Sequence, residues 1–389
     1  MISAIIAEFN PFHNGHAYIL EQAQKNSDAV IAIMSGNFVQ RGDISIYPKH
    51  TRAEIALKNG ADLIIALPAG WSMSGAENFA FGGISLIKNT KITDRIVFGA
   101  ETDNADVLRK TSDFLSSQTL AESIKSFLSS GITFASARQK ALEKISAECA
   151  EILTTPNNIL ATEYICAMNK LNFNGEIHPI KRIGINHDSN AVSGVFTSAS
   201  NIRKLILNNE DWTAFVPKNS VDILKGSDFS DFSLIDSSVI FKLRSLTLSD
   251  IQELPDISEG MENRIFEAIK TAKSVDDLCN KIKTKRYTYS RIRRIVMSAA
   301  FGIDKSFIKK EPPYIHVIGV NSRGKELLSQ IKSKSDIPVI VNAKDAKLLD
   351  GFAKKVFETE CVADDLYGLS FPSRKNCGTM YTEPLITVK

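Results

Sequence analysis

The sequence predicts an α/β fold built on a parallel sheet, followed by a mainly helical second part. Three observations lead to this prediction. Short apolar runs alternate with amphipathic stretches over the first hundred residues, each run is apolar nearly throughout, and the alternation stops near residue 215. Strands without a polar face are typical of parallel sheets that helices cover on both sides.

The expected elements of the first part follow in order along the chain. We expect strands at residues 2–9, 29–34, 63–67 and 95–98, with helices between them at 13–26, 51–59 and 79–88. Gly60 is a natural stop for the second helix, and Pro68 closes the third strand. A mainly helical stretch from 104 to 171, a strand near 177–185 and a capped helix at 197–207 come next. The pattern indicates a Rossmann-like sheet, in which ligands bind beyond the carboxyl ends of the strands.

The second part has a different character. Residues 236–300 have the pattern of helices, and a small α/β segment follows near 314–345. We therefore divide the chain into a ligand-binding domain at 1–215 and a mainly α-helical domain at 216–389. The tail after about 345 carries no motif to interpret.

Composition excludes several classes of protein. With 43% hydrophobic and 23% charged residues among 389, the chain is globular and not disordered. It has no apolar run of about 18 residues and no signal peptide, so we expect no membrane partner. Five scattered cysteines without a C-x-x-C pair indicate a reduced, cytoplasmic chain without a bound metal. The net charge of +3 is too small to identify a partner by itself.

The most specific feature is the segment Asn10-Pro-Phe-His-Asn-Gly-His16, which follows a strand and opens a helix. His13 and His16 are three residues apart, so one helical turn places them on the same face. The N–H groups and the dipole at a helix N-terminus favour phosphate, and imidazoles there add hydrogen-bond donors. The alternatives are a pair on a helix surface or half of a metal site.

Two motifs resemble those of a known superfamily. His13-Asn-Gly-His16 resembles the H-x-G-H signature of nucleotidyltransferases, and Ser198-Ala-Ser-Asn-Ile-Arg203 resembles their second signature, I-S-S-T-x-x-R. The resemblance implies attack on the α-phosphate of a nucleoside triphosphate, with His13, His16, Ser200 and Arg203 as catalytic residues. Alone, the second segment is equally a capped helix with a surface arginine.

A longer series of motifs narrows the resemblance to one family. The sequence is similar, in order over residues 2 to about 320, to the bacterial tRNA(Met) cytidine acetate ligase family. The matching blocks are Glu8-Phe-Asn-Pro-Phe-His-Asn-Gly-His16, Met34-Ser-Gly-Asn-Phe-Val-Gln-Arg-Gly42, Thr51-Arg-Ala-Glu54, Lys58-Asn-Gly-Ala-Asp-Leu63, Phe98-Gly99, Pro156-Asn-Asn-Ile-Leu160 and Ser290-Arg-Ile-Arg-Arg294. One departure is Asp43, where the family usually has Glu.

The resemblance implies a HIGH-type nucleotidyltransferase domain and a two-step reaction. ATP, with Mg²⁺, and acetate form acetyl-adenylate and pyrophosphate; the acetyl group then moves to N4 of the wobble cytidine of elongator tRNA(Met), and AMP leaves. The family's ATP site carries over to one strand–loop–helix segment and to three later places in the chain. These residues are Ile6, Ala7, Glu8, Phe9, Asn10, Pro11, Phe12, His13, Asn14, Gly15, His16, Ala17, Tyr18, Ile19, Gly99, Asn157, Asn158, Arg182 and Ile183.

The residues support some of these positions independently, and alternatives stay open. Gly99 ends a parallel strand and leaves room for a ligand, or it is a simple turn glycine. Either Asn157 or its neighbour Asn158 binds the ligand, or the pair caps a helix. Arg182 suits phosphate, or it is solvated. As a hypothesis, the loop of residues 34–42 closes over the acyl-adenylate.

Lys49 and Arg52 follow this loop. We interpret them as an exposed start of a helix rather than as phosphate ligands.

The segment 281–294 concentrates positive charge. It holds seven basic residues and no acidic ones. Basic side chains contact phosphates and tyrosines stack on bases, so we expect RNA binding here, unless the segment is only a solvated helix face. The predicted RNA-binding residues are Lys285, Arg286, Tyr287, Tyr289, Arg291, Arg293 and Arg294.

Two other functions remain open at this point. The first is a small-molecule adenylyl- or cytidylyltransferase, because H-x-G-H serves those enzymes too. The second is a nucleotide-responsive RNA-binding protein without catalysis. The oligomeric state is not readable from the sequence.

Overall fold

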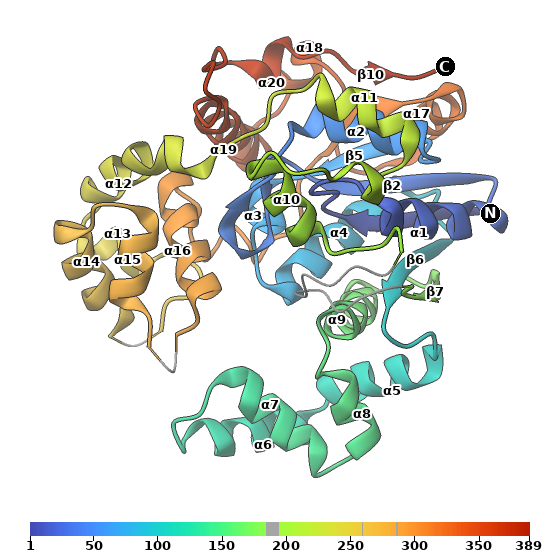
Figure 1. Ribbon diagram of the computed structural model, residues 1–389. Helices are drawn as coiled ribbons and strands as arrows, with labels where there is room; N and C mark the ends of the chain where they lie inside the picture. The colour runs from blue at the N-terminus through green and yellow to red at the C-terminus, as the bar shows by residue number, and fades with distance from the viewer. Residues whose placement is uncertain (184–193, 259, 285–286) are drawn as a thin grey trace.

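Figure 1 shows the computed structural model, which describes residues 1–183, 194–258, 260–284 and 287–389. Its centre is an eight-stranded sheet in the order β10-β8-β5-β2-β1-β6-β7, with β9 beside β8. Neighbouring strands are parallel except β5 and β8. The predicted α/β class is therefore confirmed. The strands are β1 (Ile2–Ala7), β2 (Ala29–Ser35), β5 (Leu63–Leu67), β6 (Arg95–Ala100), β7 (Glu176–Lys181), β8 (Ile315–Val320), β9 (Val339–Ile340) and β10 (Ile386–Thr387).

Helices cover both faces of the sheet. Successive side chains of a strand point to opposite faces, so alternate residues of each central strand belong to two different cores. Ile31 and Ile33 of β2 belong to one core, which includes side chains of α4 and α9. Val30, Ala32 and Met34 belong to the other, with α1, α2 and α10. The covering helices are α1 (Asn14–Lys25), α2 (Lys49–Lys58), α3 (Ala69–Ser72), α4 (Ala76–Thr90), α9 (Pro156–Leu171), α10 (Ala199–Leu207), α11 (Lys218–Lys225) and α17 (Ser322–Lys334).

The strand order changes direction at β1. The chain runs from β1 to β2 and β5 on one side, and then places β6 and β7 on the other side of β1. Loops that leave the carboxyl ends of β1 and β6 therefore diverge, and a crevice opens between them. A short ribbon of β3 (Phe38–Val39) and β4 (Asp43–Ile44), joined by the 3-10 turn η1 (Gln40–Gly42), lies near this crevice.

Two groups of helices extend from the sheet, as Figure 1 shows. The first group connects β6 to α9 and contains α5 (Ala105–Leu115), α6 (Gln118–Leu128), α7 (Phe134–Glu143) and α8 (Ala147–Ile152). The second group contains α12 (Asp236–Arg244), α13 (Leu248–Gln252), α14 (Met261–Thr271), α15 (Val275–Ile282) and α16 (Tyr289–Phe301), preceded by the 3-10 turns η2 (Thr213–Phe215) and η3 (Phe232–Ile235). Within the described ranges, no helix is long and apolar enough to span a membrane.

The small α/β segment predicted near 314–345 is present as β8, α17 and β9, but it is part of the main sheet. β8 pairs with β5, and β10 pairs with β8, so this part of the chain extends the main sheet. The sheet thus takes strands from both sides of the boundary that we placed near residue 215. The tail after 345 is ordered as α18 (Ala343–Ala346), α19 (Gly351–Gly368) and α20 (Thr379–Thr382), and α19 packs against α3 and α16.

Candidate active site

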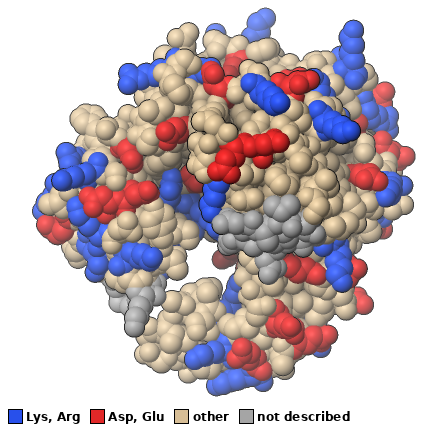
Figure 2. Space-filling view, viewed as in Figure 1, with Lys and Arg blue, Asp and Glu red and all other residues tan. Residues whose placement is uncertain are grey.

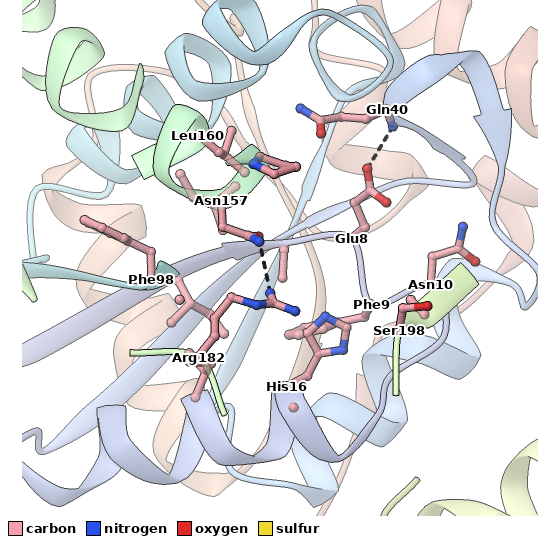
Figure 3. A pocket seen from close by; sticks show the side chains of 18 of the residues that line it. Glu8, Phe9, Asn10, His16, Gln40, Phe98, Asn157, Leu160, Arg182 and Ser198 are labelled. Atoms are coloured by element: carbon pink, nitrogen blue, oxygen red, sulfur yellow. Dashed lines mark hydrogen bonds between the residues drawn. The ribbon is translucent and has the colours of Figure 1, made fainter. Parts of the chain in front are cut away.

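A cavity of about 410 Å³ lies at the carboxyl ends of β1 and β6 (Figure 3). The loop from β1 to α1, the N-terminal ends of α9 and α10, and the turn η1 form its walls. The predicted residues that line it are Ile6, Ala7, Glu8, Phe9, Asn10, His13, Gly15, His16, Tyr18, Ile19, Gly99, Asn157, Arg182, Ile183, Ser200 and Arg203. Five further predicted residues lie outside this lining: Pro11, Phe12, Asn14, Ala17 and Asn158.

The two histidines form the N-terminal cap of α1. The Nδ1 atom of His13 accepts a hydrogen bond from the Gly15 N–H at 3.0 Å, and Nδ1 of His16 accepts one from the His13 N–H at 3.3 Å. The rings stack with their centroids 3.8 Å apart. Because both Nδ1 atoms accept, the proton of each neutral ring lies on Nε2, which makes Nε2 a donor. The pair is thus oriented to donate to a ligand.

The local sequence explains how this cap is held. A Cβ atom on Gly15 would lie 2.8 Å from Cε1 of His13, so only glycine leaves space for the ring. Phe9 and Phe12 are buried and contact the His16 ring, with centroid distances of 5.0 and 5.7 Å. Phe12 therefore supports the histidines from behind, which is why it does not line the cavity.

Arg182 reaches the cavity from the end of β7 and is oriented by Asn157. Its Nη1 donates to Oδ1 of Asn157 at 3.2 Å (Figure 3). Nδ2 of Asn157 in turn donates to Glu101 at 2.6 Å. Burial lowers the pKa of Arg182, which Glu101 partly offsets. Burial of Glu101 opposes its ionisation, but hydrogen bonds from Asn157 and from the Asn158 N–H lower its pKa overall.

Of the two neighbouring asparagines, Asn157 lines the cavity and Asn158 does not. Asn158 is buried, and its Oδ1 accepts hydrogen bonds from the backbone N–H groups of Glu101 and Thr102 at 2.9 and 3.1 Å. It shapes the loop after β6, while Asn157 faces the cavity. Gly99 lies in the same wall, where a Cβ atom would be 3.2 Å from Ile19 and 3.4 Å from Arg182.

The second motif caps a helix and also lines the cavity. Ser198 caps α10, since its Oγ accepts a hydrogen bond from the Asn201 N–H at 3.1 Å. Ser198 and Ser200 also line the cavity, with their hydroxyl oxygens 2.9 Å apart. Arg203 donates from Nη1 to the backbone carbonyl of Asn10 at 2.6 Å. This bond joins α10 to the loop that carries the histidines.

The turn η1 supplies residues that the predicted site omitted. Gln40, Arg41 and Asp43 line the cavity, so part of the 34–42 loop forms one of its walls. The Gln40 N–H donates to Oε1 of Glu8 at 3.0 Å. Burial raises the pKa of Glu8, although Arg203, this N–H and Arg41 act in the opposite direction. Gly36 and Gly42, which flank Gln40 and Arg41, are the feature of the sequence that could have identified this wall of the cavity.

Apolar side chains complete the cavity, and none of these was predicted as a site residue, although Phe98, Pro156, Ile159 and Leu160 stand in the matching blocks. They come from α4, β6 and α9, and no polar pattern marks them. These residues are Phe79, Val97, Phe98, Pro156, Ile159, Leu160 and Tyr164.

The interpretation of Lys49 and Arg52 as an exposed helix start is wrong. Arg52 is fully buried and donates to the backbone carbonyls of Tyr47, Glu8, Ser35 and Gly36. Lys49 is buried in an ion pair with Asp364 of α19. Both cations have partners that are remote in sequence, which allows their burial. Arg52 thus holds together the carboxyl ends of β1 and β2, next to the cavity.

The predicted RNA-binding segment is largely bonded within the protein. Arg291 and Arg294 both donate to Asp256, and Arg293 donates to the Gly42 carbonyl and to Asp43.

The two tyrosines of this segment differ in exposure. Tyr287 is only 9% exposed, so its ring belongs to the core and is not presented to a base. Tyr289 is half-buried, and its hydroxyl donates to Asp276. Lys285 and Arg286 lie outside the described residues.

Comparisons with known proteins agree with this geometry. Residues 1–380 match the family model described as HIGH Nucleotidyl Transferase. The chain is 39% identical to tRNA(Met) cytidine acetate ligase of Thermoanaerobacter sp. (strain X514) and 38% identical to that of Acetivibrio thermocellus, and each match covers 99% of both proteins.

Solved structures agree as well. Apo Thermotoga maritima TmcAL matches with a TM-score of 0.92 at 29% identity, over 100% of this chain and 99% of that one. A second form of that protein, bound with alpha-thio ATP, matches with a TM-score of 0.91 at the same identity and coverage. With relatives this similar over their full length, the chain belongs to the tRNA(Met) cytidine acetate ligase family of HIGH nucleotidyl transferases.

Proposed function

We propose that the chain is an ATP-dependent ligase that acetylates N4 of the wobble cytidine of elongator tRNA(Met), through acetyl-adenylate. The names of its relatives include tRNA(Met), and the T. maritima protein is bound with alpha-thio ATP in one solved structure. One observation carries the proposal: His13, His16, Arg182 and Arg203 converge on one cavity at a helix N-terminus. Such an arrangement suits a polyphosphate. An enzyme with these substrates acts in the cytoplasm.

In the first step, an acetate oxygen forms a bond to the α-phosphorus of ATP, and the bond from that phosphorus to pyrophosphate breaks. Acetate is ionised at pH 7, so this step needs no general base. His13 and His16 donate from Nε2 to phosphate oxygens as negative charge moves onto pyrophosphate. Arg182 and Arg203 add positive charge in a partly enclosed cavity, where its effect is larger than in water.

We propose that the Mg²⁺ that accompanies ATP would need only one or two carboxylates of the cavity, since Mg²⁺ usually takes few protein ligands beside substrate phosphates. Asp43 is a carboxylate of the cavity lining that would hold such an ion beside the phosphates. Over the described ranges, no three His, Cys, Asp or Glu side chains form a metal-binding group. When bound, the ion neutralises charge on pyrophosphate.

In the second step, N4 of cytosine forms a bond to the acetyl carbon, and the bond from that carbon to AMP breaks. The amine then loses a proton. Glu8 is suited to accept it: it lines the cavity, its Oε1 is fixed by the Gln40 N–H, and its Oε2 has no hydrogen bond among the described residues. Burial raises the pKa of Glu8, which makes its carboxylate a stronger base.

The test follows each step separately. Acetate-dependent exchange of pyrophosphate into ATP reports the first step, and transfer of labelled acetate to tRNA(Met) reports both. His16→Ala should lower the exchange by about 100-fold, because it removes one donor to the developing charge. Binding of tRNA should change less than twofold.

His178→Ala is the matched control, since His178 lies on β7 outside the cavity lining. It should leave both activities unchanged. Transfer of AMP to a small molecule, or an ATP-binding protein without turnover, would contradict the proposal. So would a His16→Ala variant with normal exchange.

A further inference from the structure

A second cavity, of about 620 Å³, adjoins the first one. Arg41 and Asp43 line both cavities, so these two residues form the wall between them. The other lining residues come from the end of α15 and the start of α16: Lys283, Thr284, Thr288, Tyr289, Ser290 and Arg293. In Figure 2, Lys and Arg side chains lie among Asp and Glu side chains on the lobe of these helices, and a hollow separates that lobe from the lower helices. Apart from Asp43, the residues of the second cavity have no part in ATP binding as proposed above.

The chemistry of the second cavity suits a nucleotide phosphate and a base. Its lining holds three basic side chains, Arg41, Lys283 and Arg293, and one acidic side chain, Asp43. Arg293 is paired with Asp43 and Asp276, whereas the exposed Lys283 has no ion pair among the described residues. Lys283 is therefore available to a phosphate.

The ring and hydroxyl groups of the cavity complement this charge. Tyr289 lines it with a half-buried ring whose hydroxyl is held by Asp276. A fixed aromatic ring is a stacking surface for an unpaired base. Ser290 adds a hydroxyl in the first turn of α16, where N–H groups favour phosphate oxygens.

The wall between the cavities is a turn that is held by contacts on both of its sides. Arg41 and Gly42 both have φ of 68°, a conformation that a residue with a side chain seldom adopts. Gly42 lies directly on α16, because a Cβ atom there would be 2.9 Å from the carbonyl group of Arg293. On the other side, the Gln40 N–H binds Glu8. The turn thus places Arg41 between the helix that lines the second cavity and the carboxylate of the first.

We propose that the second cavity binds an unpaired ribonucleotide next to the cytidine that is acetylated, with its phosphate at Lys283 and Arg41 and its base against Tyr289. This inference rests on the proposed function, because it requires an RNA substrate in the first cavity. It assigns the main RNA contact to Lys283 in place of Arg291 and Arg294, which are bonded to Asp256.

The test measures binding directly, so it does not depend on catalysis. The probe is an RNA hairpin with the anticodon loop of tRNA(Met), and its affinity is measured by fluorescence anisotropy over a range of salt concentrations. Lys283→Ala should weaken binding about tenfold and reduce the salt slope by about one, as loss of one phosphate contact predicts. Lys283→Arg should restore both. Lys332→Ala, on the exposed side of α17, is the matched control with the same change in charge.

The outcomes separate this inference from the proposed function. Normal affinity and salt slope for Lys283→Ala would overturn the second cavity as an RNA site, even if the wild-type protein acetylates tRNA. A loss of acetate-dependent pyrophosphate exchange in Lys283→Ala without RNA, with normal hairpin binding, would also overturn it. A wild-type protein that binds the hairpin through Lys283 but never acetylates tRNA would instead contradict the proposed function.

Discussion

Asn157 orients Arg182 through a hydrogen bond of 3.2 Å from Nη1 of the guanidinium to Oδ1 of the amide. The amide is itself held by Glu101, 2.6 Å from Nδ2. These three residues come from the start of α9, the segment after β7 and the segment after β6. These hydrogen bonds hold the guanidinium group of Arg182 in the wall of the cavity, where it can contact the proposed triphosphate.

Asn157→Ala removes the acceptor and should raise the KM for ATP about tenfold. A hydrogen bond to a charged group contributes about 1.5 kcal/mol, which corresponds to that factor. Steady-state pyrophosphate exchange over a range of ATP concentrations measures the effect. Asn169→Ala, at an exposed position of the same helix, is the control. An unchanged KM in Asn157→Ala would show that Arg182 does not depend on this amide.

Gly42→Ala tests the contact between the turn η1 and α16. Both strain at φ of 68° and the 2.9 Å approach to Arg293 should destabilise this variant. Gly302→Ala is a close control, because Gly302 has φ of 69° and no atom within 4 Å of an added Cβ. We expect a loss of about 1 kcal/mol for Gly302→Ala from the backbone alone, and at least 1 kcal/mol more for Gly42→Ala from overpacking. Equal losses in urea unfolding would argue against a tight contact.

The sequence was sufficient to predict the parts of the fold that have local causes. The strands β1, β2, β5 and β6 are apolar runs between helices, and the capping residues of α1 and α10 lie within a few positions of the helix ends. His13 and His16 could be predicted as a site because the pattern, a strand followed by a helix N-terminus, is complete within one short segment.

Long-range pairings were not predictable in this way. β8 lies beside β5 although about 250 residues separate them, and nothing local marks that register. The same holds for Lys49 and Arg52, whose charge indicates solvent. Their burial depends on Asp364 and on four backbone carbonyls that only the folded chain brings together. The role proposed for Arg41 was not predictable either, because the turn η1 and α16 meet only in the folded chain.

The buried carboxyl group of Glu360 makes stability depend on pH. Its Oε1 accepts a hydrogen bond from the Ala69 N–H at 2.6 Å, and burial raises its pKa to about 7 despite this bond and the charge of Lys49. The unfolded chain has the ordinary value, near 4.5. Between these two values the native state binds more protons than the unfolded state, so the free energy of unfolding falls as pH rises from 4.5 to 7.

Glu360→Gln should remove this dependence, because glutamine keeps an acceptor for the Ala69 N–H but does not ionise. A difference of two to three pKa units corresponds to about 3 kcal/mol, so wild type should lose about that much more stability than Glu360→Gln between pH 4.5 and pH 8. Urea unfolding at both pH values measures the difference. Glu358→Gln, on the exposed face of α19, should behave as wild type. Parallel losses in Glu360→Gln and wild type would mean that Glu360 ionises normally in the folded protein.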